Sequence, residues 1–236
     1  MPYYLSLIVV IAALCAFTGE AFAHREDYID ETLVYQTLER EEFEPEYWFD
    51  FGRRFDTGNN FTRHNFAAEY GFTDHWMVDG RVTAEKEDGR SFSFDSGRLE
   101  TRYRFYEEGT LPVDIALSVE VNTERDEANV LRFGIEPRLI LSKDFGKLNL
   151  TLNLAEEIPV DSRREAFNIS SGFRYDATEL FRFGSELKYN VDERQASVIP
   201  QIWFAFPHDL TLKLGFSYGF DHNKESFLRV AIEKGF

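Results

Sequence analysis

The last eleven residues of the chain, 226–236, read S-F-L-R-V-A-I-E-K-G-F. Apolar side chains recur at every second position and fall on one face: Leu228, Val230, Ile232 and Phe236. Lys234 is the single interruption of that face. Alternation with a period of two predicts a β-strand with one apolar and one polar face, here ending on an aromatic residue.

The same alternation returns about eleven more times upstream, in residues 44–55, 61–72, 76–85, 98–105, 113–121, 131–141, 148–154, 167–175, 181–191, 198–206 and 210–220. A typical segment has about ten to twelve residues, which is the length that a tilted strand needs to cross a bilayer. An even number of strands returns both ends of a barrel to one side, and closure leaves no unpaired edge. The sequence therefore predicts an all-β protein, a single transmembrane antiparallel β-barrel of about twelve strands over residues 44–236.

The polar faces of these segments carry nearly equal numbers of acidic and basic side chains. Such a balance fits an enclosed lumen in which charges pair across strands. A soluble sandwich would instead need to pair all its apolar faces in one core. The residues predicted to line the lumen are Trp48, Asp50, Arg54, Arg63, Glu69, Asp79, Arg81, Arg98, Glu100, Arg102, Arg104, Glu120, Arg132, Glu136, Arg138, Arg174, Arg182, Glu186, Lys188, Lys213 and Arg229.

Residues 1–23 have the features of a cleaved signal peptide. Residues 5–17 form an apolar run that is too short to cross a bilayer as a helix, and Ala21-Phe22-Ala23 supplies a small-x-small cleavage site. Cleavage would also remove the one cysteine of the chain, Cys15. The mature domain is therefore expected to fold without disulfides.

Residues 24–43 form an acidic segment without a clear period, and two interpretations stay open. In the first, the segment is a periplasmic tail or a short helix. In the second, it is a plug that enters the lumen, where its acids would need basic partners such as Arg104 and Arg182. Tyr28, Leu33 and Tyr35 would then cover the apolar lumen residues Trp48 and Trp203.

Composition and motifs exclude several functions. A net charge of −16 argues against a nucleic-acid partner. The five histidines are scattered with no ligand spacing, so no metal or other cofactor is indicated. No nucleophile-elbow, Walker or zincin motif is present, and His64 on the lipid-facing side has no serine beside it on its own strand face. A non-enzyme is expected, and an outer-membrane lipid hydrolase is the weakest alternative.

Two stretches resemble known proteins. The closing strand resembles that of bacterial outer-membrane β-barrels, whose terminal Phe is read by the insertion machinery. The resemblance implies an assembly signal formed by Phe236, Ile232, Val230 and Leu228. Residues 71–76, G-F-T-D-H-W, resemble the "GLTDR" turn of an outer-membrane transporter family linked to meta-pathway phenol degradation, with His75 where that family favours Arg. That family implies uptake of small molecules and assigns no site residues.

These patterns together predict a narrow pore or transporter for an unidentified small solute in the bacterial outer membrane. The alternative is a structural or interaction barrel whose lumen is closed by ion pairs. The expected surroundings are outer-membrane lipid and lipopolysaccharide, and the expected partner in assembly is the barrel-insertion machinery.

Both termini are predicted to be periplasmic, on the side of the turns near residues 72–75, 107–112, 142–147, 176–179 and 207–209. Loops near residues 56–60, 85–90, 123–129, 160–165, 192–195 and 221–225 are predicted to face outward. Pro137 and Pro200 fall within predicted strands. Proline has no N–H to donate to a ladder, so we expect a bulge or a missing bond at each.

Overall fold

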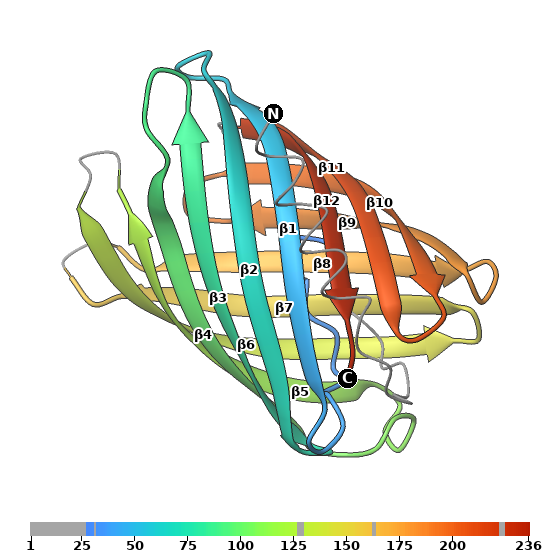
Figure 1. Ribbon diagram of the computed structural model, residues 1–236. Coiled ribbons are helices and arrows are strands. Elements are labelled where there is room, and N and C mark those ends of the chain that lie inside the picture. Colours follow the sequence, from blue (N-terminus) through green and yellow to red (C-terminus); the bar gives the residue numbers. More distant parts are fainter. Residues whose placement is uncertain (1–26, 31, 127–129, 162–163, 222–224) are drawn as a thin grey trace.

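The computed structural model describes the chain except for residues 1–26, 31, 127–129, 162–163 and 222–224. Twelve antiparallel strands form a closed barrel in which each strand pairs with the next and β12 pairs with β1 (Figure 1). The predicted all-β barrel of twelve strands is confirmed. The predicted signal peptide, residues 1–23, lies outside the described residues. Within the described part of the chain, there is no helix long and apolar enough to cross a membrane.

The strands follow one another along the sequence with short connections. Their bounds are β1 Phe43–Arg54, β2 Asn60–Thr73, β3 Trp76–Glu87, β4 Ser93–Arg104, β5 Asp114–Arg125, β6 Leu131–Phe145, β7 Leu148–Pro159, β8 Ala166–Asp176, β9 Phe181–Asn190, β10 Gln195–Phe206, β11 Leu210–Asp221 and β12 Glu225–Lys234. Most bounds lie within a few residues of the predicted segments. The largest differences are at the start of β4 and the end of β7, where the apolar alternation fades but the backbone pairing continues.

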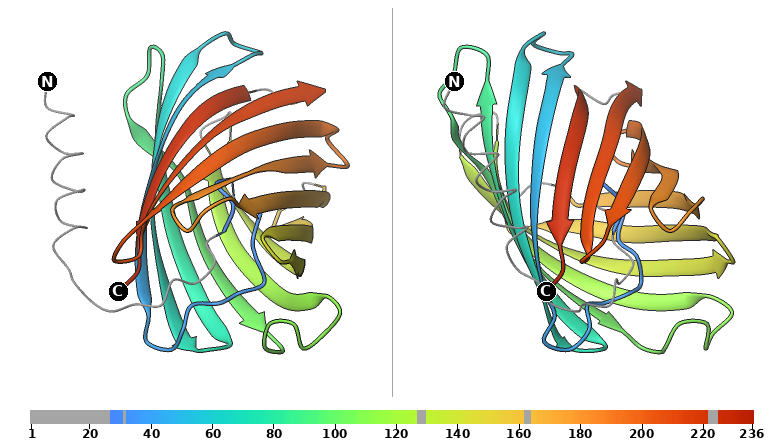
Figure 2. Two further views of the ribbon diagram at one scale, coloured as in Figure 1. Left: turned by 90° about the vertical axis from the view of Figure 1, so that its right-hand side faces the viewer. Right: turned by 45° about the vertical axis from the view of Figure 1, so that its right-hand side comes forward.

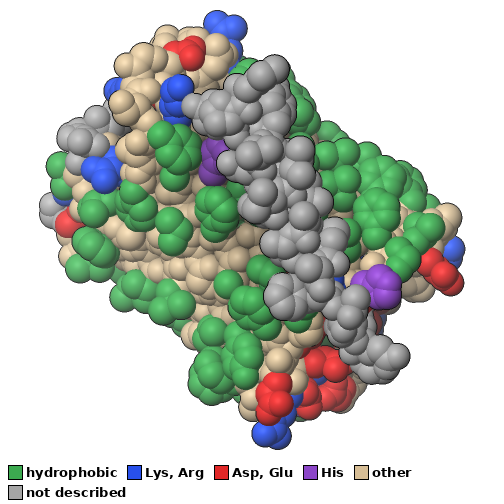
Figure 3. Space-filling view, in the orientation of Figure 1, with side chains coloured by type: hydrophobic (Ala, Val, Ile, Leu, Met, Phe, Trp, Pro, Cys, Tyr) green, Lys and Arg blue, Asp and Glu red, His purple; other side chains and the backbone are tan. Residues whose placement is uncertain are grey.

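The two faces of the strands differ as the alternation requires. Large apolar side chains such as Leu99, Phe51 and Phe133 point outward, with exposed fractions of 60%, 55% and 52%. Figure 3 shows hydrophobic side chains spread over the outer wall, with charged ones gathered toward the ends. Charged residues of the inner face are enclosed, and Asp50 and Glu186 are both 0% exposed. This inversion of a soluble protein's pattern suits a wall with lipid outside and a polar lumen inside.

The two strand prolines interrupt pairing without shifting the register. In the β6–β7 ladder the pairing passes from Ile135↔Ile158 to Arg138↔Ala155, with no pairs between them among these described residues. The β10–β11 ladder has the same gap around Pro200. The residues on both sides of each gap pair with the same offset, so neither strand contains an extra residue there. Of the two expected outcomes, the missing bond is therefore confirmed and the bulge is not. Register shifts occur elsewhere, at Gly71/Thr73 and Thr83/Ala84.

Residues 27–30 and 32–38 lie inside the barrel, toward the end where the C-terminus is found, and residues 39–41 are exposed (Figure 2). Tyr28, Val34 and Leu38 are 3%, 1% and 0% exposed. The segment contains turns and extended backbone and no helix in its described residues. It leaves the lumen where the Glu41 N–H donates to the Gly71 carbonyl oxygen, at 2.8 Å, and the chain then turns into β1.

Candidate functional site: the lumen and its N-terminal segment

The residues predicted to line the lumen are all buried or partly buried in the structure. They come from ten of the strands, β1 to β6, β8, β9, β11 and β12, because inward positions recur at every second residue of each strand. Trp203 on β10 also lines the lumen, at 0% exposed. This burial agrees with the inward face on which the alternation places these side chains.

Acidic side chains form a continuous row across six neighbouring strands. The ladders place Glu44 opposite Glu69, Glu69 opposite Asp79 and Asp79 opposite Glu100. Glu100 in turn lies opposite Glu120, and Glu120 opposite Glu136. Like charges directly opposite one another destabilise a sheet, so this row needs compensation from other directions.

Arginines two residues further along the same strands provide part of that compensation. Arg81 Nη2 lies 3.2 Å from Asp79 Oδ2, and Arg102 Nη2 lies 3.3 Å from Glu100 Oε1. Arg138 contacts Glu136 in the same way. Residues i and i+2 share a strand face, so each pair forms along a strand, beside the row of acids. The predicted pairing across strands is also found, because Arg138 Nη1 lies 3.6 Å from Glu100 Oε2.

A second network of ion pairs joins the last strand, β12, to the first strands, β1 and β2. Arg63 on β2 donates two hydrogen bonds to Glu225 on β12, at 2.7 and 2.6 Å, and a third to Glu85 on β3, at 2.6 Å. Arg229 on β12 donates two to Asp50 on β1, at 2.7 and 2.8 Å. Two-pronged guanidinium–carboxylate pairs fix geometry as well as charge, so these contacts stabilise the closure of the barrel.

The N-terminal segment is bound to the wall through its own backbone. The amide N–H groups of Asp30 and Thr32 donate to the two oxygens of Glu186, at 2.8 and 3.0 Å. Ile29 N–H donates to Gln201 Oε1 at 2.8 Å. Asn153 accepts the Leu33 N–H at 2.8 Å and donates its own amide to the Leu33 carbonyl at 2.9 Å. These polar side chains supply the partners that buried backbone requires.

The acids of the segment pair with bases deep in the lumen. Asp27 accepts from both terminal nitrogens of Arg102, at 3.1 and 2.6 Å. Asp30 lies 3.1 Å from Arg229 Nη1 and 3.1 Å from Lys188 Nζ.

These partners correct the prediction that Arg104 would pair with the acids of the segment, while the prediction for Arg182 stays a prediction. The segment reaches further inward than the lumen mouth. Arg104, which lies at the mouth, donates instead to the hydroxyl oxygen of Thr37, at 3.1 Å, and Arg182 lies 3.8 Å from Asp176.

Apolar contacts also bind the segment to the barrel wall. The Tyr28 and Trp203 rings meet edge to face with centroids 5.9 Å apart, and Tyr28 donates its hydroxyl to Asn149 at 3.0 Å. Ile29 packs in one buried cluster with Trp48, Ile199 and Ala231, and Leu33 and Tyr35 pack in another with Ala116 and Ile140. Sequence reasoning missed Ala116, Ile140 and Ile199. Each of them occupies an inward position in the alternation of its strand, and this position was the signal that would have identified it.

Beyond the segment, the lumen opens into a cavity of about 550 Å³ at the loop end of the barrel. Asp30 of the segment forms part of its floor. Its acidic lining residues are Asp30, Asp95, Glu120, Glu124, Glu136, Glu157 and Glu225. Its basic lining residues are Arg54, Arg63, Arg98, Arg125, Arg138, Lys188 and Arg229. The cavity is therefore polar and close to neutral, and large enough for a small hydrophilic solute.

Burial raises the pKa of Glu42, at the point where the segment leaves the lumen, even though its carboxylate accepts a hydrogen bond from the Glu39 N–H, at 2.8 Å. His64 on the outer wall shares a hydrogen bond of 2.7 Å with the Tyr47 hydroxyl and packs against Phe49 and Phe92. A phenol is not the serine nucleophile that a triad hydrolase uses. The arrangement around His64 is that of an aromatic cluster on the barrel surface.

The fold is shared with solved outer-membrane barrels. The KdgM porin matches with a TM-score of 0.61 and 10% identity, over 82% of this chain and 99% of that one. An outer-membrane channel from Pseudomonas putida F1 matches with a TM-score of 0.59 and 12% identity, over 90% and 100%. The NanC porin matches with a TM-score of 0.56 and 14% identity, over 80% and 98%. No family model and no curated protein matches the sequence, so the resemblance to the phenol-degradation family stays a prediction.

Proposed function

We propose that this protein is a pore of the bacterial outer membrane for small hydrophilic solutes, and that residues 27–42 plug its lumen. The observation that carries the proposal is the binding of this segment across the lumen, from Arg102 on β4 to Glu186 on β9 and Arg229 on β12. A segment held mainly by hydrogen bonds and ion pairs, above which lies a polar cavity, suits a gate in a water-filled passage.

The similar folds support this function. They belong to porins and channels, and one solved structure is a KdgM porin in complex with disordered oligogalacturonate. We propose a passage of the same type here, narrower because of the segment and weakly selective because the cavity lining is balanced in charge. The proposed role requires no catalytic group or cofactor.

The proposed orientation places both termini and the segment on the periplasmic side, with the cavity facing outward. It is supported by four of the five connections at the end where the segment enters, which have two to four residues each, since outer-membrane barrels have short periplasmic turns. For example, only residues 74–75 separate β2 from β3, and only residues 146–147 separate β6 from β7. The fifth connection, residues 105–113, is longer.

The test is the conductance of the mature protein in planar bilayers, with and without residues 24–40. Deletion up to residue 40 keeps the bonds that Glu41 and Glu42 make with Gly71, so β1 should still enter the barrel correctly. We expect the shortened protein to conduct more, because the floor of the cavity is removed. Equal conductance of two correctly folded forms, both open, would contradict the plug.

A structural or interaction barrel is the second candidate. The dense ion pairing around Arg63 and Arg229 favours it, because such networks hold the wall rigid and fill the lumen. The same recordings separate the two candidates. If neither form conducts, the pore proposal fails and the structural candidate is favoured.

A further inference from the structure

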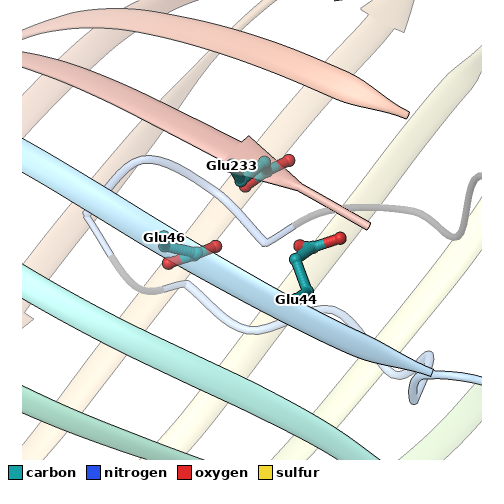
Figure 4. A group of neighbouring side chains, drawn as sticks. All are labelled: Glu44, Glu46 and Glu233. Carbon is teal, nitrogen blue, oxygen red and sulfur yellow. The ribbon is translucent and has the colours of Figure 1, made fainter. Parts of the chain in front are cut away.

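Three glutamates meet at the seam where the barrel closes. Glu44 and Glu46 belong to β1 and Glu233 belongs to β12, and their carboxylates turn toward a common space (Figure 4). One carboxylate oxygen from each lies within 4.8 Å of the other two. The residues are 5%, 7% and 2% exposed, so bulk water does little to separate these charges.

The ladders bring these acids together rather than keeping them apart. Glu46 lies directly opposite Glu233 in the β1–β12 ladder, and Glu44 lies opposite Glu69 in the β1–β2 ladder. Opposed like charges destabilise a sheet, and enclosed carboxylates need a counter-charge. Lys213 contacts the Glu233 carboxylate.

Glu46 provides a separate observation that points to a ligand. Its Oε2 atom is buried and has no hydrogen-bond partner among the described residues. A buried carboxylate oxygen is expected to accept bonds from N–H, O–H or a cation. A void of about 10 Å³ also borders Glu46 and Glu69, which is close to the space that one water molecule occupies. Glu46 thus has a buried, unsatisfied carboxylate beside the other two glutamates, and it borders a void with room for a water, although Glu44 and Glu233 do not line that void.

The donor chemistry indicates which ligand would fit. The cluster offers carboxylate oxygens and neither imidazole nor thiolate, which is the donor set that hard cations prefer. Ca²⁺ binds oxygens at about 2.3–2.6 Å and accepts irregular geometry, so two of its ligands stand up to roughly 5 Å apart. The separations in the cluster already fall within that limit. Mg²⁺ demands a near-ideal octahedron at about 2.0–2.1 Å and loses its own water reluctantly, so a cluster fixed on two strands suits it less than Ca²⁺.

We propose that Glu44, Glu46 and Glu233 form a Ca²⁺ site that joins β1 to β12, with water completing the coordination. A bound cation would turn the repulsion between opposed acids into attraction across the seam. The site would therefore stabilise the closed barrel. None of the three glutamates lines the cavity of about 550 Å³, and the presence of the site does not depend on the proposed pore function.

The test uses the purified mature protein, folded in a non-ionic detergent, treated with EDTA and dialysed. Calorimetric titration with CaCl₂ should give one bound ion per barrel, with an affinity of about 0.1–1 mM or tighter, as in extracellular calcium modules. Titration with MgCl₂ should give weaker binding. The thermal unfolding midpoint should rise with CaCl₂ concentration, since a ligand of the folded state stabilises it.

Glu46→Gln is the diagnostic variant, because the Glu46 carboxylate oxygen has no bond in the protein to lose. It should bind Ca²⁺ at least about tenfold more weakly, as loss of a coordinating charge requires. Without Ca²⁺, Glu46→Gln should unfold at a higher temperature than the wild type, because one of the opposed charges is gone. With Ca²⁺ the order should reverse. Glu179→Gln, at an exposed acid in the turn before β9, is the matched control and should behave as the wild type.

Three outcomes would overturn the proposal. The first is a wild-type protein that binds no Ca²⁺ at about 10 mM, well above the usual range. The second is a Glu46→Gln protein whose Ca²⁺ response equals that of the wild type. The third is equal binding of Mg²⁺, which would remove the preference for calcium. If Glu46→Gln fails to fold, Glu44→Gln takes its place with the same expected loss of binding.

Discussion

At the scale of single residues, Glu186 shows how one side chain holds the N-terminal segment. It is 0% exposed, and its two oxygens accept hydrogen bonds from Asp30 N–H, Thr32 N–H and the Gln201 side-chain amide, the last at 2.8 Å. A buried network in which each member has its partners is stabilising, whereas a partly satisfied one is not.

We therefore expect Glu186→Gln to loosen the segment. The amide nitrogen of the glutamine would face a backbone N–H that also donates, so this N–H would lose its acceptor. Leaving a buried donor without a partner costs about 1–3 kcal/mol. Hydrogen exchange of the amides in residues 28–34 should accelerate, while exchange in the barrel strands stays as in the wild type. Glu179→Gln should leave exchange in both regions unchanged. Equal protection of the segment in Glu186→Gln and wild-type protein would show that this carboxylate does not hold it.

The sequence predicted that Glu186 faces the lumen but did not predict its partners. The side of the sheet toward which a side chain points is a local property, because the period of two determines it within one strand. The partners Asp30 and Thr32 lie more than 150 residues away along the chain, and no short pattern connects such positions. The same limit explains why Arg102 and Arg229 were not recognised as the bases that bind Asp27 and Asp30.

At the scale of elements, the strands were predictable and their exact pairing was not. Each strand repeats an alternation that depends only on its own residues, so twelve strands follow from the sequence. Register depends on turns and bulges as well, and the shifts at Gly71/Thr73 and Thr83/Ala84 were not predicted from the sequence. The row of opposed acids from Glu44 to Glu136 is a product of that register and was therefore not foreseen.

The gap at Pro137 leads to a prediction about β6. Pro137 pairs with Val119 on β5, and the interruption lies on the β7 side. Replacing Pro137 with Val should restore an N–H toward β7, since the register is already equal on both sides of the gap. We expect the free energy of unfolding to rise by about 0.5–1.5 kcal/mol, the net value of one hydrogen bond.

Denaturant unfolding of the folded protein in detergent measures this change. Ile135→Val is the control, because it alters an outward apolar side chain on the same strand without touching the ladder. A stability of Pro137→Val at or below that of the wild type would mean that the gap is not the result of the missing donor.

At the scale of the whole molecule, the barrel has two unlike ends. One end is crossed by the N-terminal segment and carries the C-terminus, while the other holds the charged cavity of about 550 Å³. The two ends of the predicted barrel domain do meet on one side, because Phe43 and Phe236 exchange two backbone hydrogen bonds, at 3.2 and 3.0 Å.

The proposed orientation predicts which loops react from outside the cell. Thr57 is exposed in the loop between β1 and β2, and Glu179 is exposed in a turn at the opposite end. The one natural cysteine lies in the predicted signal peptide, so a cysteine at either position would be unique in the mature chain. Thr57→Cys should be labelled by an impermeant maleimide on intact cells, and Glu179→Cys only after permeabilisation. The reverse pattern would invert the proposed topology.

The covalent link between the segment and β1 has a consequence for how the lumen is occupied. A tethered binding partner acts at an effective concentration of roughly millimolar when the tether is short. A free peptide of the same sequence with a dissociation constant of about 0.1 mM would thus, once tethered, fill the lumen for roughly nine-tenths of the time. One lost contact of about 1.4 kcal/mol would shift that ratio tenfold. If the segment is the plug proposed above, a few hydrogen bonds would therefore be enough to set the fraction of time that the lumen is free.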